Sequence, residues 1–112
     1  MKKFMVLYQS PISARDKMAQ ASPEQIKGSM NEWIQWKAKT GDDKVEWGMP
    51  LQTGKHIESG EATASNLSVS GYAIVHAGSL DEAVDMLKDH PHLKAPTGSS
   101  IEVLEFLPMP GM

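Results

Sequence analysis

Histidines are the residues of this sequence best suited to proton transfer or metal binding, because the chain has four of them and no cysteine. His76 lies near the end of an otherwise apolar stretch, residues 72–77. One interpretation is an ordinary hydrogen-bonded strand residue. The other is a pocket histidine that acts as acid, base or ligand donor. We keep His76 as the catalytic candidate.

His90-Pro91-His92 has the spacing of a His-x-His metal arm. A metal site would need a third ligand, and His56 or Asp89 could supply it. The simpler interpretation is a histidine at a helix C-terminus, where the helix dipole favours positive charge, followed by a proline that ends the helix. Two loop histidines are weak evidence for metal binding. We therefore predict no metal and no other cofactor.

Tyr8, Trp33 and Trp36 are predicted to line a pocket between sheet and helices together with His76. Trp33 lies on the apolar stripe of a predicted helix, so packing in the core is its first interpretation. Trp36 is one position off that stripe, and could line the pocket or be covered by a partner chain. Aromatic rings with polar groups suit both cores and small apolar ligand sites.

Length and charge limit the classes of protein that this chain can represent. Its 112 residues form one predicted domain, 1–112. The 11 basic and 14 acidic residues give a net charge of −3, which argues against a nucleic-acid partner. No apolar run approaches 18 residues, so we expect no membrane span. The apolar run at 4–8 is too short for a signal peptide, and the cytoplasm is the expected compartment.

Hydropathy and turn residues predict the elements that must position these side chains. Residues 4–8 are a strand and residues 11–21 are irregular. A helix is expected over 23–40, with Ser22 as N-cap, Pro23 at its first position, Gln25 completing a capping box and Gly41 just beyond its end. Ile26, Met30, Trp33, Ile34 and Lys37 follow at helical spacing and form its predicted stripe.

The second half of the chain repeats the alternation of strand and helix. Strands are predicted at 44–47, 72–77 and 101–107, and a helix runs from the N-cap Ser79 to about residue 90. A small hairpin is expected within 51–57, turning at Thr53-Gly54, and 92–100 is a loop. The order βαββαβ predicts an α+β ferredoxin-like fold, an antiparallel sheet with two helices on one face.

Two helices cover one face of such a sheet, yet three of the strands are apolar on both faces. Met5 and Leu7 alternate with Phe4, Val6 and Tyr8, for example. A bare apolar face of this size exceeds what monomers usually expose. We expect a homodimer that buries it, and the alternative is that residues 50–71 fold over it.

The sequence resembles the YCII-related (DGPF-domain) family of small bacterial proteins. The resemblance lies in KFMVLY at 3–8, GYAIV at 71–75, SLDEA at 79–83, and HP at 90–91 followed by GSSIEV at 98–103. It implies a ferredoxin-like fold paired as a dimeric α+β barrel. The Asp-Gly-Pro-Phe motif is absent, because the corresponding residues 62–68 read ATASNLS.

A proposed catalytic histidine of some family members has no counterpart here, since Asn31, Glu32, Trp33 and Ile34 occupy that part of the helix. The predicted function is therefore binding of a small organic metabolite by a homodimer, in the pocket between sheet and helices. The alternative is a cofactor-independent enzyme that acts on a small organic molecule with His76 as acid or base.

Overall fold

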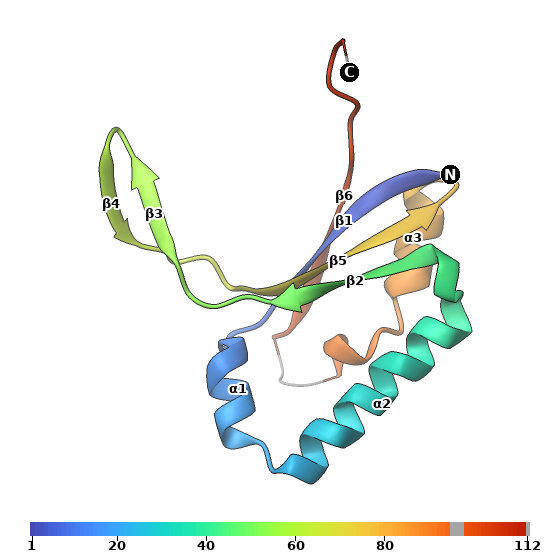
Figure 1. The fold of residues 1–112 in the computed structure, drawn as a ribbon, viewed down its shortest axis with the longest axis horizontal. Helices are drawn as coiled ribbons and strands as arrows, with labels where there is room; N and C mark the ends of the chain where they lie inside the picture. Colours follow the sequence, from blue (N-terminus) through green and yellow to red (C-terminus); the bar gives the residue numbers. More distant parts are fainter. Residues whose placement is uncertain (95–97, 112) are drawn as a thin grey trace.

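A four-stranded antiparallel sheet forms the centre of the molecule in the computed structural model, which describes residues 1–94 and 98–111 (Figure 1). Its strands lie side by side in the order β2-β5-β1-β6. Their bounds are β1 Lys2–Gln9, β2 Val45–Pro50, β5 Val69–Ala77 and β6 Ser100–Glu105. A separate two-stranded sheet joins β3 Lys55–Glu58 to β4 Glu61–Ala64. The chain is thus a mixed α+β protein, as predicted.

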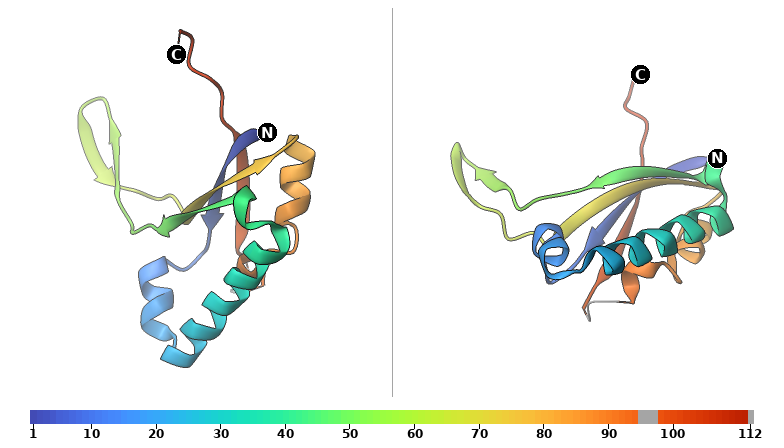
Figure 2. Two further views of the ribbon diagram at one scale, coloured as in Figure 1. Left: turned by 45° about the vertical axis from the view of Figure 1, so that its right-hand side comes forward. Right: turned by 60° about the horizontal axis from the view of Figure 1, so that its bottom comes forward.

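Three helices, α1 Ala14–Gln20, α2 Pro23–Thr40 and α3 Leu80–Leu87, and two short 3₁₀ turns, η1 Asp42–Lys44 and η2 Pro91–Leu93, complete the described elements. Figure 2 shows the helices together on one side of the sheet. Among the described residues, no helix combines the length and apolar character needed to cross a membrane.

Helix α2 begins and ends where the sequence predicts. The Ser22 hydroxyl accepts a hydrogen bond from the Gln25 N–H, and the Gln25 side chain accepts one from the Ser22 N–H, which confirms the capping box. At the other end Gly41 has φ of 124°, and its N–H donates to the Lys37 carbonyl. A positive φ of this kind favours glycine over any residue with a side chain.

Several predicted boundaries are wrong. Helix α1 lies in the segment predicted to be irregular. The Ser13 hydroxyl caps this helix by accepting a hydrogen bond from the Asp16 N–H. The helix buries no side chain, so no apolar stripe in the sequence indicated it. The hairpin turns at Ser59-Gly60 instead of Thr53-Gly54, because both residues adopt the positive φ that a tight hairpin turn requires. Helix α3 ends at Leu87, earlier than predicted.

The core lies between the sheet and the helices, and strict alternation decides which strand residues enter it. Buried residues from β1, β2, β5, α2 and α3 form one cluster: Phe4, Val6, Tyr8, Trp36, Val45, Ala73, Val75, Ala77, Ala83 and Leu87. Trp36 is the buried residue of α2, and Trp33 of the predicted stripe packs against the cluster as expected, but Ile26, Met30 and Ile34 are exposed. The Trp36 indole N–H donates to the Met86 carbonyl, 3.0 Å away, which orients this face of the helix inward.

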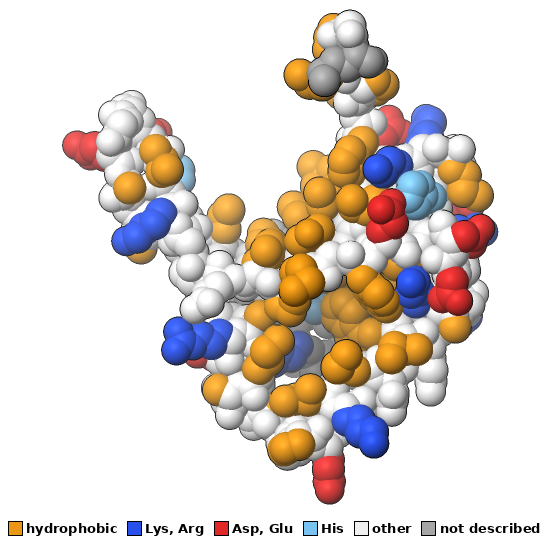
Figure 3. All heavy atoms as spheres, in the orientation of Figure 1, with side chains coloured by type: hydrophobic (Ala, Val, Ile, Leu, Met, Phe, Trp, Pro, Cys, Tyr) orange, Lys and Arg blue, Asp and Glu red, His pale blue; other side chains and the backbone are white. Residues whose placement is uncertain are grey.

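The opposite face of the sheet is not covered by residues 50–71. Met5, Leu7, Tyr72 and Ile74 are half-buried there, and Leu104 of β6 is half exposed. The hairpin β3–β4 and the segment after β6 both rise on this side, away from the helices (Figures 1 and 2). Figure 3 shows a band of hydrophobic side chains that crosses the sheet from the base of the C-terminal segment.

Candidate binding site

Three of the predicted pocket residues meet around His90, a residue that the pocket prediction did not include. Tyr8 comes from β1, and Trp33 and Trp36 come from consecutive turns of α2. The centre of the His90 ring lies 5.0 Å from Tyr8, 4.5 Å from Trp33 and 4.3 Å from Trp36. Trp47 of β2 adds a fourth aromatic ring, 6.0 Å from Trp33. Alternation places Tyr8 and Trp47 on the same face of the sheet.

Hydrogen bonds determine which nitrogen of His90 carries its proton. The His92 N–H donates to His90 Nδ1 at 3.0 Å, so Nδ1 is an acceptor and the neutral ring is protonated at Nε2. Nε2 lies 3.2 Å from the Tyr8 hydroxyl oxygen and donates to it. A tyrosine hydroxyl that accepts in this way still has its own proton to donate.

Burial sets the charge state of this pair. His90 is 1% exposed. That burial, followed by the positive charge on a protonated His92, lowers the pKa of His90 to about 3, although Asp89 opposes the shift. Burial also raises the pKa of the Tyr8 hydroxyl. Both groups are therefore neutral at pH 7, and a hydrogen bond between two uncharged side chains joins them.

His92 holds the end of β1. Its Nε2 donates to the Gln9 carbonyl at 2.8 Å. Burial lowers the pKa of His92, while the hydrogen bond to Gln9 works in the opposite direction. The dipole explanation offered for His90 is wrong, because α3 ends three residues earlier and burial keeps the ring neutral.

A metal arm at His90 and His92 finds no support in this geometry. Both nitrogens of His90 and the Nε2 atom of His92 are used for hydrogen bonds within the protein. Within residues 1–94 and 98–111, no three histidine, aspartate or glutamate side chains gather closely enough to hold a metal ion.

The predicted placement of His76 beside the aromatic rings is wrong. It alternates with the buried Val75 and Ala77, so its side chain lies on the sheet face that points away from the helices. There Nε2 lies 2.5 Å from a carboxylate oxygen of Glu46 on the adjacent strand. The hydrogen bond from His76, aided by the charge of Lys3, lowers the pKa of Glu46 against a smaller opposing effect of burial.

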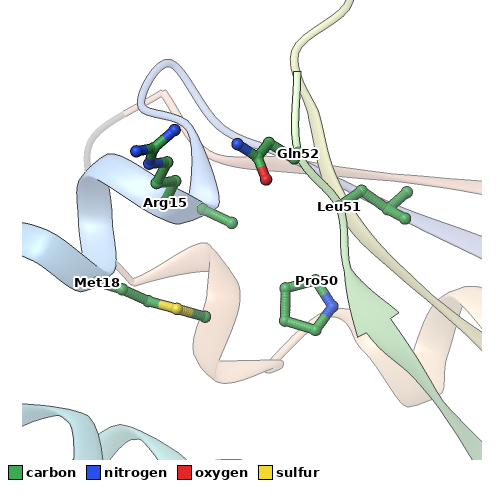
Figure 4. A pocket seen from close by; sticks show the side chains of 6 residues that line it. Arg15, Met18, Pro50, Leu51 and Gln52 are labelled. Atoms are coloured by element: carbon green, nitrogen blue, oxygen red, sulfur yellow. The ribbon is translucent and has the colours of Figure 1, made fainter. Parts of the chain in front are cut away.

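An open hollow of about 520 Å³ lies between the start of α1 and the end of β2 (Figure 4). It is lined by Ala14, Arg15, Met18, Pro50, Leu51 and Gln52. Four of these side chains, Ala14, Met18, Pro50 and Leu51, are apolar, and the Arg15 guanidinium adds a positive charge. This site could not be predicted from the sequence patterns, because they gave no clear indication of α1. The one local signal was Ser13 followed three residues later by Asp16, a pattern of helix starts.

A second hollow, of about 320 Å³, shares Leu51 with the first and is lined by the segments that follow β1 and β2 and by the one that leads into β5. Its lining is mostly small and polar: Ser10, Pro11, Ser13, Leu51, Thr53, Ser65, Asn66, Leu67, Ser68, Val69 and Ser70. The buried aromatic cluster lines neither hollow. The candidate site is therefore the apolar hollow at α1, and the cluster around His90 is packed core beneath α2.

Comparison with models of known protein families and with curated proteins gives no match in either case.

Proposed function

We propose that the protein is a homodimer of the dimeric α+β barrel type, similar to the YCII-related family, which binds a small organic molecule. The strand order β2-β5-β1-β6, with α2 after β1 and α3 after β5, supports a ferredoxin-like topology. The apolar sheet face opposite the helices supports pairing, because Leu104 and Phe106 remain 50% and 42% exposed in one chain.

The hollow between α1 and β2 is the observation that carries the ligand-binding proposal. Ligand sites in proteins are concave, mostly apolar and supplied with a few polar groups that orient the guest. Met18, Pro50 and Leu51 supply the apolar wall, and Arg15 and Gln52 supply polar groups from opposite sides (Figure 4). This combination suits a small molecule with an apolar body and a polar or anionic end.

A thermal-shift screen of small organic acids and their neutral amides tests the proposal. A ligand present at about 100 times its Kd adds about 2.7 kcal/mol to the free energy of unfolding, which raises the Tm of a domain of this size by roughly 10–20 °C. Met18→Lys places a charge in the apolar wall and abolishes the shift, whereas Leu80→Lys, at a similarly exposed residue of α3, leaves it unchanged. A ligand that shifts both variants equally binds elsewhere, and that result would overturn the assignment of the hollow.

His76 and Glu46 support a second candidate, a cofactor-independent enzyme. A histidine hydrogen-bonded to a carboxylate is a common arrangement for proton transfer. The pair lies on the sheet face that a second copy would cover, so the reaction would occur at the interface. Mass spectrometry of each screened ligand after incubation with the wild type and with His76→Gln distinguishes the two functions. Conversion that requires His76 favours the enzyme, and binding without conversion favours the binding protein.

A further inference from the structure

The hairpin formed by β3 and β4 has two chemically different faces. In its register Lys55 pairs with Ala64, His56 with Thr63, Ile57 with Ala62, and Glu58 with Glu61. Paired side chains share a face and alternate along the strand. One face therefore has Ile57, Ala62 and Ala64 with the aliphatic stem of Lys55, and the other is entirely polar.

Backbone hydrogen bonds shape the hairpin and the ribbon that connects it to the main sheet. Ser59 and Gly60 form its turn, with φ values of 49° and 82°. At its base the Ser65 N–H donates to the Gly54 carbonyl, and nearer the sheet the Leu51 N–H donates to the Ser70 carbonyl. The ribbon that leaves β2 and returns to β5 is thus continuous with the hairpin, and it rises from the uncovered side of the sheet (Figure 2).

No residue of β3 or β4 is buried in the single chain. All eight are exposed, and Ile57 is 73% exposed. An isolated two-stranded hairpin is only marginally stable in water, and needs a further surface on its apolar face. The structure therefore shows an ordered element whose apolar face is not packed within its own chain.

The size of the sheet indicates what covers that face. Neighbouring strands lie about 4.8 Å apart, and a strand rises about 3.3 Å per residue. A sheet of four strands with about six residues each therefore has a face of roughly 400 Å² in projection. A stable interface buries about 800 Å² on each partner. Side chains make the accessible area of a face larger than its projection, but the sheet is a small interface, and the hairpins, which rise on the same side, are placed to add to it.

We propose that the β3–β4 hairpin is a clasp that packs its apolar face against a second copy of the chain. Since a two-fold dimer uses the same surface on both copies, each chain contributes one hairpin and receives one. This inference rests on the homodimer proposed above. Figure 3 shows hydrophobic side chains on the hairpin as well as along the sheet, which is the pattern that a reciprocal clasp requires.

Sedimentation of two matched hairpin variants tests the clasp. Ile57→Asp places a charge on the apolar face, and Thr63→Asp makes the same change from a β-branched residue on the polar face. We expect Ile57→Asp to raise the dimer dissociation constant at least about tenfold, because one isoleucine is buried in each copy. Thr63→Asp should leave the constant within about twofold of the wild-type value.

The outcomes separate this inference from the proposed function. A wild-type dimer weakened by Ile57→Asp alone supports the clasp. A wild-type dimer that both variants leave unchanged, or weaken equally, overturns the clasp while leaving the dimer intact. A wild type that sediments as a single chain at micromolar concentration overturns the dimer itself. Circular dichroism of each variant establishes that the four-stranded sheet is retained.

Discussion

Acid should destabilise this protein through His90. Burial holds the pKa of His90 at about 3 in the folded chain, against 6.5 for an exposed histidine. A group whose folded pKa is depressed contributes stability above its unfolded pKa, and that contribution is lost as the pH falls towards the folded value. Between pH 7 and pH 5 the linkage gives a loss of about 2 kcal/mol in the free energy of unfolding, and the loss continues towards pH 3.

Urea denaturation at pH 7, 6 and 5, followed by tryptophan fluorescence, measures this loss. The protein concentration is the same at each pH, because dimerisation would add to the free energy of unfolding. His90→Gln has no titrating ring and should be less stable at pH 7, but its stability should fall by about 2 kcal/mol less than that of the wild type. His92 titrates in both proteins, so its own contribution largely cancels. His56→Gln, at an exposed hairpin histidine, is the matched control and should retain the wild-type slope.

An equal loss of stability in the wild type and in His90→Gln would refute the assignment. A second readout does not depend on the folding of the variant: the His90 ring protons of the wild type, followed by NMR, should show no titration between pH 8 and pH 5. A titration of that ring near pH 6.5 would mean that His90 is accessible to water, and the packed cluster around it would then be incorrect.

Four further substitutions test the local structure, each measured by urea denaturation at pH 7. Ser22→Ala removes the N-cap of α2 and should cost about 1 kcal/mol; an unchanged midpoint would mean that the cap is not formed in solution. Gly48→Ala should lower the free energy of unfolding by about 1–3 kcal/mol, because the added Cβ would overlap the Tyr72 carbonyl. Gly28 lies in α2 with open space around it, so Gly28→Ala should raise the free energy of unfolding by up to about 1 kcal/mol. Trp36→Phe removes the indole hydrogen bond to α3 and should lower the free energy of unfolding by about 1 kcal/mol or more. A change near zero would contradict the buried position of this ring.

The aromatic cluster around His90 was only partly predictable from the sequence. Tyr8, Trp33 and Trp36 were expected to line a pocket together; they do come together, around His90, but they line neither hollow. His76 was expected with them and His90 was not. The position of His76 was missed because a shift of one residue in a strand decides on which face a side chain lies. The position of His90 was missed because its contact with Tyr8 joins positions 82 residues apart.

Local signals determined the parts of this protein that the sequence alone could predict. The capping box at Ser22, the proline at the start of α2 and Gly41 at its end determined that helix to the residue, because their hydrogen bonds join residues within one turn. Strand alternation likewise predicted that Phe4, Val6 and Tyr8 share a face.

Only the tertiary structure decided which side of α2 is buried, that His90 is neutral, and that a hollow lies between α1 and β2. Trp36 enters the core in place of Ile26 and Met30 because its indole fits against His90 and bonds to Met86. The neutrality of His90 comes from burial by residues far apart in the sequence, and the hollow depends on where a helix without an apolar stripe comes to rest. Each of these depends on packing between distant segments, which no local pattern encodes.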